Sequence, residues 1–64
     1  MVTINGEAHA VEGASITAYL SHAGYEVARV AVELNGDIVS KAAYGDTVLC
    51  AGDEVEIVAF VGGG

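Results

Sequence analysis

The stretch EIVAFVGGG (residues 56–64) shows an apparent β-strand that runs directly into three glycines. Successive side chains of a strand point to opposite faces. We therefore expect one face of this strand to join the core, formed by Val55, Ile57, Ala59 and Val61. The outward face would then consist of Glu54, Glu56, Val58 and Phe60. We interpret residues 1–61 as one folded domain and residues 62–64 as a flexible glycine tail, because glycines outside a sheet can adopt many backbone conformations.

Two Asn-Gly pairs organise the chain before this strand. Asn5-Gly6 lies within MVTINGEAHAV (residues 1–11), and Asn35-Gly36 lies within RVAVELNGDIVS (residues 29–40). Asn-Gly between alternating apolar residues is a strong hairpin signal, because both turn positions require positive φ. The sequence therefore predicts strands at 1–5 and 7–11 and a second hairpin around Asn35-Gly36.

The segment GASITAYLSHAG (residues 13–24) predicts one short helix of about nine residues. Its apolar residues recur at helical spacing, at Ile16, Tyr19, Leu20 and Ala23. Ser15 is a suitable N-cap, and Gly24 suits the left-handed position that follows many helices. A helix this short needs packing against other elements in order to persist.

These elements predict an α+β fold with the ubiquitin-like β-grasp arrangement. We expect a mixed sheet of about five strands, with the main helix on one face and the last strand beside the first. KAAYGD (residues 41–46) would form a turn or a single helical turn, and TVL (residues 47–49) a short strand. The three tyrosines are interpreted as packing residues. The expected core consists of Ile4, Ile16, Leu20, Val30, Val32, Val39, Val48, Val55 and Ile57.

The charge balance excludes some partners. Nine Asp and Glu residues face only Arg29 and Lys41, which gives a net charge of −7. Nucleic-acid binding needs clustered Lys and Arg, so we expect no nucleic-acid partner, and the charge instead fits docking on basic protein surfaces. No signal peptide is visible, and no apolar stretch approaches the roughly 20 residues that span a membrane. We therefore expect no membrane contact and a cytoplasmic location.

The remaining reactive side chains do not form a recognisable site. His9 and His22 have no further ligands at metal-binding spacing, so no metal is expected. Cys50 cannot form an internal disulfide and is interpreted as a small buried or half-buried residue, and one cysteine cannot hold an iron–sulfur cluster that needs four. Lys41 is expected to be solvated. No nucleophile–base pair, phosphate loop or paired carboxylates stand out, so we do not expect an autonomous enzyme.

The chain as a whole resembles the ThiS family, the sulfur carriers of bacterial thiamine biosynthesis. The resemblance covers the whole length and is most specific in VAVELNGDIV (residues 30–39), in GDEVEIV (residues 52–58) and in the glycine ending. One departure is that family members often have Pro and then Arg where this chain has Ser40 and Lys41. Lysine lacks the planar fork with which arginine grips carboxylates, so no partner contact is carried over to Lys41.

The resemblance implies that Gly64, preceded by Gly62 and Gly63, carries sulfur on its carboxyl group. A C-terminal carboxylate is ionised at neutral pH and is a poor electrophile, so it needs activation. By the resemblance, an E1-like adenylating enzyme of the ThiF type uses ATP to form an acyl-adenylate, and a cysteine desulfurase or other persulfide donor converts it to a thiocarboxylate. A thiazole synthase of the ThiG type would receive the sulfur. The chain itself would bind no cofactor and would act as a co-substrate.

The outward face of the last strand is the candidate docking surface. Ordering each glycine of the tail costs about 1–2 kcal/mol, so the folded domain must supply binding energy. Burial of Val58 and Phe60 would contribute about 1.5–3 kcal/mol each, and Glu54 and Glu56 would meet basic partner residues. Three alternatives stay open at this point: a small-subunit carrier of the molybdopterin synthase type, a ubiquitin-like protein modifier, and a passive β-grasp interaction module.

Overall fold

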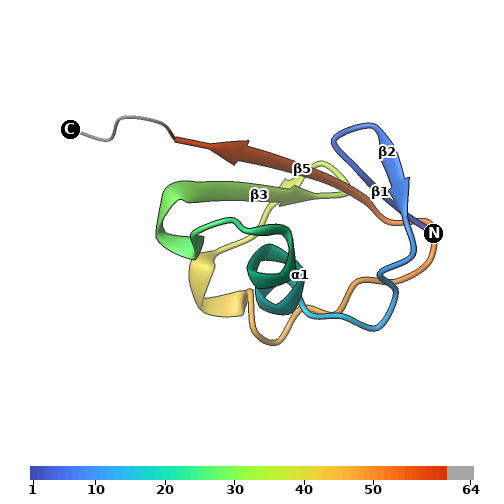
Figure 1. Ribbon diagram of the computed structural model, residues 1–64, viewed down its shortest axis with the longest axis horizontal. Helices are drawn as coiled ribbons and strands as arrows, with labels where there is room; N and C mark the ends of the chain where they lie inside the picture. Colours follow the sequence, from blue (N-terminus) through green and yellow to red (C-terminus); the bar gives the residue numbers. More distant parts are fainter. Residues whose placement is uncertain (61–64) are drawn as a thin grey trace.

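A computed structural model describes residues 1–60 as five strands, one α-helix and two short 3₁₀ helices (Figure 1). The strands are β1 (Val2–Ile4), β2 (Glu7–His9), β3 (Val30–Leu34), β4 (Asp37–Ile38) and β5 (Glu54–Ala59). The helix is α1 (Ile16–Ala23), and the 3₁₀ helices are η1 (Val27–Arg29) and η2 (Lys41–Ala43). The expectations for Val61, Gly62, Gly63 and Gly64 lie outside the described residues.

The five strands form one mixed sheet in the order β2-β1-β5-β3-β4. β1 pairs with β2 and β3 pairs with β4 as antiparallel hairpins. β5 lies between them, parallel to β1 and antiparallel to β3. The predicted mixed sheet, with the last strand beside the first, is confirmed.

Both predicted hairpin turns are confirmed by backbone angles. Asn5 and Gly6 have φ of 50° and 83°, and Asn35 and Gly36 have φ of 51° and 87°. Positive φ at both central positions is what a two-residue turn between twisted strands requires, and Asn and Gly are the residues that tolerate it best.

The helix also begins and ends where the sequence predicts. The Ser15 side chain accepts a hydrogen bond from the Ala18 N–H at 3.0 Å, which satisfies one of the unpaired amides of the first turn. Gly24 follows the helix with φ of 87°, and its N–H donates back to carbonyls of the last turn. α1 lies against one face of the sheet (Figure 1). No helix in residues 1–60 is long and apolar enough to cross a membrane.

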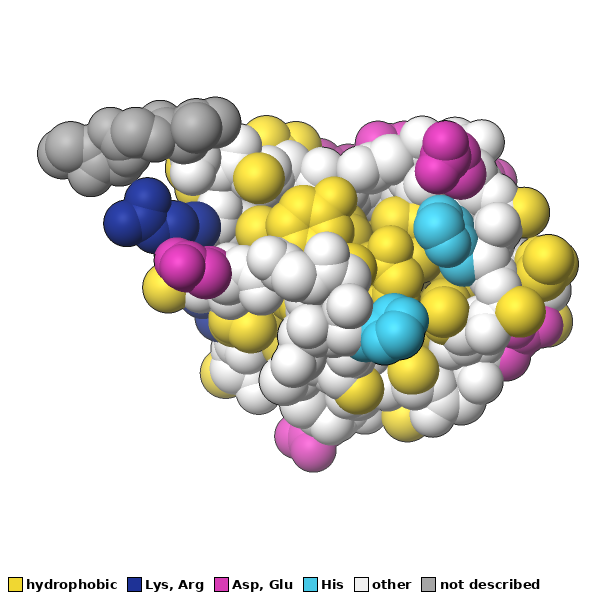
Figure 2. Space-filling view, in the orientation of Figure 1, with side chains coloured by type: hydrophobic (Ala, Val, Ile, Leu, Met, Phe, Trp, Pro, Cys, Tyr) yellow, Lys and Arg dark blue, Asp and Glu magenta, His cyan; other side chains and the backbone are white. Residues whose placement is uncertain are grey.

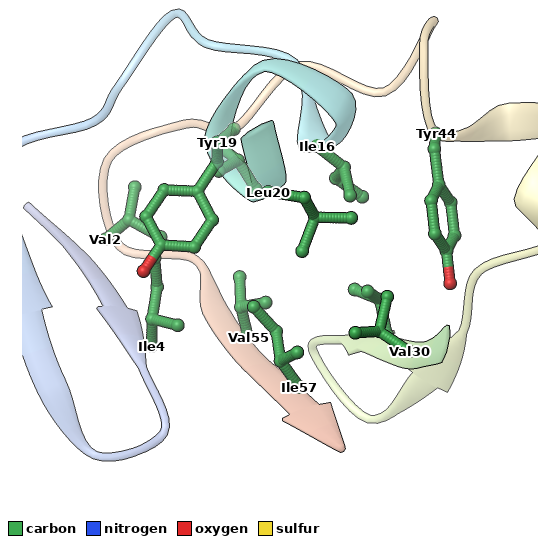
Figure 3. Packing of buried hydrophobic residues seen from close by; sticks show 11 residues of the cluster. Val2, Ile4, Ile16, Tyr19, Leu20, Val30, Tyr44, Val55 and Ile57 are labelled. Carbon is green, nitrogen blue, oxygen red and sulfur yellow. The ribbon is translucent and has the colours of Figure 1, made fainter. Parts of the chain in front are cut away.

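The core fills the space between α1 and the sheet (Figure 3). Seven of the nine expected core residues are buried. Tyr19 and Tyr44 are also buried, and Tyr25 is half-buried against the core, which confirms the packing role of the tyrosines. The buried residues are Val2, Ile4, Ile16, Tyr19, Leu20, Val30, Val32, Tyr44, Leu49, Val55 and Ile57.

Three expectations about burial outside β5 are wrong. Val48 is 51% exposed because the loop makes a single bridge at this point, between Ser15 and Val48, and turns the next residue, Leu49, into the core instead. Val39 is only half-buried. Cys50 is exposed, since it begins the tight turn that leads into β5.

Candidate functional site

The first half of β5 is held firmly from both sides. On the β1 side, the N–H groups of Thr3 and Asn5 donate to the carbonyls of Asp53 and Val55, each at 2.9 Å. On the β3 side, the Asn35 N–H donates to the Glu54 carbonyl at 2.7 Å. The start of the strand is therefore a central strand of the sheet, with its inward side chains buried.

The two hairpin asparagines add side-chain bonds that strengthen this hold. Asn5 accepts from the Ile57 N–H at 2.7 Å through Oδ1 and donates to the Ile57 carbonyl at 3.2 Å through Nδ2. Asn35 accepts from the Glu54 N–H at 2.9 Å and donates to an Asp53 carboxylate oxygen at 3.1 Å. Each residue thus makes the turn of its own hairpin and also binds β5, which fixes the strand that leads to the glycines.

The end of β5 has a different environment. The Phe60 N–H donates to the Arg29 carbonyl at 2.7 Å, so β3 still runs along one side. The register with β1, however, stops at Ile4 opposite Val55. Val58 and Phe60 are each 56% exposed. Ala59 is exposed as well, so its expected place in the core is wrong: the pairing with β1 ends before this part of the strand.

The face of the sheet opposite α1, here called the outer sheet face, carries every predicted docking residue. Residues directly opposite in a ladder point to the same face, and Ala31 pairs with Val58 while Glu33 pairs with Glu56 and Ile38. The outer sheet face therefore has an apolar part at the end of β5 and an acidic part at its start. Its members are Ala31, Glu33, Ile38, Glu54, Glu56, Val58 and Phe60.

The acidic part contains charges that the described chain does not neutralise. Glu33 and Glu56 stand directly opposite each other, a placement that is unfavourable for like charges. None of Glu33, Glu54 and Glu56 takes part in an ion pair within residues 1–60. The three carboxylates line a shallow hollow of about 380 Å³ together with Asn35 and Gly36. Such a surface favours a partner that brings positive charge.

Lys41 is exposed, as the sequence predicts, and its ammonium also has a structural role. Its ammonium donates to the Val27 carbonyl at 2.6 Å and to the Val30 carbonyl at 2.8 Å, and it lies 5.8 Å from the centre of the Tyr44 ring. These contacts join η2 to the junction between η1 and β3. That junction also contains Arg29, whose carbonyl binds the Phe60 N–H.

The other candidate reactive residues are not brought together. No group of three or more His, Cys, Asp or Glu residues within residues 1–60 is placed to hold a metal ion. The ring of His9 instead packs edge to face against that of Tyr19, with 6.1 Å between the ring centres. Burial raises the pKa of Tyr19. Figure 2 shows both histidines on one face of the molecule, while the basic side chains gather at one end.

Sequence reasoning placed Glu54, Glu56, Val58 and Phe60 on an exposed face, and the structure brings them together there. It missed Glu33 and Ile38, the latter 81% exposed. The signal was present, because alternation along residues 30–34 already sets Glu33 opposite to the core face. The strand partner that joins it to Glu56 could not be read from either segment alone.

The comparison with family models decides the membership of this chain. The model described as "ThiS family" matches residues 2–64, which is nearly the whole chain. The chain belongs to the ThiS family. This ThiS-family chain is 39% identical over 64 residues to "Sulfur carrier protein ThiS" of Thermus thermophilus, and the match covers all of both proteins.

Two further curated relatives are longer proteins. The chain is 41% identical over 64 residues to "Thiazole synthase" of Magnetococcus marinus, where the match covers 98% of this chain and 20% of the relative. The same figures hold for "Thiazole synthase" of Paramagnetospirillum magneticum. This ThiS-family chain thus spans about a fifth of the length of these two relatives.

A solved structure supports the fold. The crystal structure of the thiamine biosynthesis protein ThiS from Geobacter metallireducens matches with a TM-score of 0.77 at 34% identity. The match covers 98% of this chain and 97% of that protein. The five-stranded mixed sheet with one helix is therefore the ubiquitin-like β-grasp of the ThiS family.

Proposed function

We propose that this chain is a sulfur carrier of thiamine biosynthesis and that the carboxyl group of Gly64 carries the sulfur. The observation that carries the proposal is the end-to-end match to a sulfur carrier protein, within a family match that includes the final glycines. The fold is suited to this task, because β5 ends at Ala59, only five residues before Gly64 in the sequence.

The chemistry begins with a carboxylate that must be activated. The α-carboxyl group is ionised near neutral pH, so a sulfur nucleophile does not attack it. In the proposed reaction, a carboxylate oxygen attacks the α-phosphorus of ATP on an E1-like adenylating enzyme, and pyrophosphate leaves. The resulting acyl-adenylate is a mixed anhydride whose leaving group is AMP.

Sulfur enters in the next step. The terminal sulfur of a persulfide, supplied by a cysteine desulfurase or similar donor, attacks the acyl carbon and AMP leaves. A thiol then attacks the donor's sulfur in the acyl disulfide and breaks the S–S bond, which leaves a thiocarboxylate on Gly64 and the donor cysteine in a disulfide with the thiol. The chain is consumed and regenerated as a co-substrate, so it needs no catalytic residue or bound cofactor of its own.

The proposed acceptor is a thiazole synthase. Support comes from the two relatives with that name, in which a region resembling this chain belongs to the same polypeptide. A carrier and the enzyme that uses its sulfur work at high effective concentration when they are joined, so their fusion fits a delivery step between them.

The outer sheet face fits the docking step. Val58 and Phe60 together offer an apolar contact, and burying a large apolar side chain contributes about 1.5–3 kcal/mol. The carboxylates of Glu33, Glu54 and Glu56, which form no ion pair within residues 1–60, offer long-range attraction for a basic enzyme surface. Docking of the folded domain offsets the entropy lost when the glycines become ordered in an active site.

The test is the intact mass of the 64-residue chain after incubation with the adenylating enzyme from the same organism, a persulfide-loaded desulfurase and a reducing thiol. The proposal predicts ATP-dependent exchange of one oxygen for sulfur in the full chain. The variant that lacks Gly63 and Gly64 is expected to keep the circular dichroism of the full chain and to remain unmodified. No mass change in the full chain, with an enzyme shown to be active on a second ThiS-family carrier, would contradict the proposal.

A further inference from the structure

The end of β5 has an unpaired backbone edge on the side where β1 has ended. The direction of each residue follows from the bonds already described. Glu54 bonds to Asn35 and Phe60 bonds to Arg29, the residues on either side of β3, and alternation in the antiparallel ladder gives Glu56 and Val58 the same direction. Val55 and Ile57 bond to the opposite side, to β1 and to Asn5. The N–H and C=O of Ala59 therefore point to the β1 side.

Asn5 marks the point where the pairing on that side stops. Its carboxamide binds both the N–H and the C=O of Ile57, as a neighbouring strand residue would. Beyond it the chain turns away through Gly6 into β2. Within residues 1–60, no backbone or side-chain group bonds to Ala59 from this side. Figure 1 shows β5 running past the β1–β2 hairpin with β3 along its other side.

Ala59 is the next residue on this edge after Ile57, whose N–H and C=O are both bonded to Asn5. Its own N–H and C=O have no such partner within residues 1–60. An edge of this kind is a template for an added strand, and main-chain bonds then give affinity while side chains give specificity. The exposed side chains of Val58 and Phe60 flank Ala59 on the outer sheet face. They offer an apolar contact to the same added strand.

We propose that an extended segment of the adenylating enzyme pairs with the β1-side edge of β5 at Ala59, in the place that β1 leaves open. This inference rests on the proposed function, because it names how that enzyme would hold its co-substrate. The segment would bear apolar side chains against Val58 and Phe60 and a basic side chain toward Glu56. Pairing at Ala59 sets the register of the strand five residues before Gly64.

The molecule itself argues for an enzyme segment rather than a second copy of the chain. A net charge of −7 opposes self-association, and the carboxylates of Glu33, Glu54 and Glu56 would face one another if two copies met at this face. A basic, apolar strand from an enzyme meets neither obstacle.

The test compares two substitutions at one position. Ala59→Pro removes the N–H that points to the open edge, and it leaves the bonds of Val58 to β3 and of Phe60 to Arg29 in place. Ala59→Ser keeps the N–H and adds a single oxygen. We expect Ala59→Pro to lower kcat/KM for adenylation about tenfold or more, and Ala59→Ser to stay within about twofold of the unchanged chain. Thermal unfolding and the amide spectrum of β3 are the checks that both variants are folded.

Amide hydrogen exchange in the complex gives a second, direct measurement. In the free protein the Ala59 amide should exchange far faster than the Val58 amide, which bonds to β3. With the adenylating enzyme at saturation and without ATP, the Ala59 amide should be slowed about tenfold or more. An unprotected Ala59 amide in a saturated complex, or full activity of Ala59→Pro, overturns the edge pairing.

The outcomes separate this inference from the proposed function. If a thiocarboxylate forms on the chain while the Ala59 amide stays unprotected, the carrier function is supported and the edge pairing is wrong. If the Ala59 amide is protected but the mass of the chain does not change, the edge pairing is supported and the carrier function is wrong. If the chain and the enzyme form no complex, both are wrong.

Discussion

The two halves of β5 have similar sequences and opposite environments. Val55 and Ile57 in the first half are only 3% and 7% exposed, whereas Val58 and Phe60 at the end are each 56% exposed. The side chains of Val55 and Ile57 point to the core, whereas those of Val58 and Phe60 lie on the outer sheet face. The pairing of the backbone differs as well, because β1 stops at Ile4 while β3 continues to Val30. One continuous strand therefore supplies core side chains at its start and an accessible apolar surface at its end. Stability and partner binding should be separable along it by substitution.

The strongest separation is expected from Ile57→Ala. The side chain lies in the core between α1 and the sheet, so its truncation removes buried apolar contacts and leaves a cavity. We expect a loss of about 2–5 kcal/mol in the free energy of unfolding. Chemical denaturation followed by circular dichroism measures this. A loss below about 1 kcal/mol would mean that the first half of β5 does not hold the fold as described.

Phe60→Ala should have the opposite profile. The ring is more than half exposed and is not part of the core cluster within residues 1–60, so the stability is expected to change by less than about 0.5 kcal/mol. Loss of its burial at the enzyme surface should lower kcat/KM for adenylation about tenfold, equivalent to about 1.4 kcal/mol. The matched control is Val48→Ala, which truncates another side chain that is about half exposed but lies away from the outer sheet face. Equal effects of the two variants on adenylation would contradict a docking role for Phe60.

Lys41→Met tests how the exposed half is supported. The substitution keeps most of the aliphatic length but removes the ammonium that binds the carbonyls of Val27 and Val30. We expect the free energy of unfolding to fall by about 1–2 kcal/mol. Hydrogen bonds from charged donors are stronger than those from neutral donors, but this ammonium is partly solvated. The Phe60 amide bonds to the carbonyl of Arg29, which lies in sequence between Val27 and Val30. Its hydrogen exchange should therefore also become faster when the ammonium no longer holds this segment. Lys41→Arg, which keeps a charged donor, should restore part of the loss.

The smallest expected effect lies at the well-held start of the sheet. The N-terminal ammonium donates to a Glu12 carboxylate oxygen at 2.7 Å, and this bond holds the pKa of Glu12 below its usual range. A carboxyl group whose folded pKa is depressed stabilises the fold above its unfolded pKa, and this stability is lost as pH falls through the folded value. Thermal unfolding of Glu12→Gln should therefore differ slightly from that of the unchanged chain near neutral pH. The difference should vanish in acid, and a difference that grows as pH falls would have the wrong sign.

Local patterns predicted the elements of this fold well because their causes are local. The two Asn-Gly turns, the Ser15 cap and the left-handed Gly24 each depend on residues within one turn of the chain. The alternation in residues 54–60 likewise placed Val58 and Phe60 on the outer face. What alternation cannot give is how far a neighbouring strand extends, and this is why Ala59 was expected in the core.

Long-range contacts account for the other differences. The roles of Asn5 and Asn35 on β5 depend on strands that meet only after folding, and Lys41 binds carbonyls more than ten residues away. In the loop before β5, Val48 and Leu49 are adjacent and both apolar, so only the tertiary structure decides which one is buried. The exposed position of Cys50 follows from the same loop.

The most direct test of the account is to locate the sulfur within the modified protein. Fragmentation of the intact, sulfur-loaded chain in a mass spectrometer separates pieces that contain Cys50 from pieces that contain only the C-terminal residues. The account predicts that the added sulfur stays with the fragment that ends at Gly64, after treatment with a reductant that removes persulfides. Sulfur found on the fragment with Cys50, and lost on reduction, would contradict the central claim that the end of this strand serves to present a terminal thiocarboxylate.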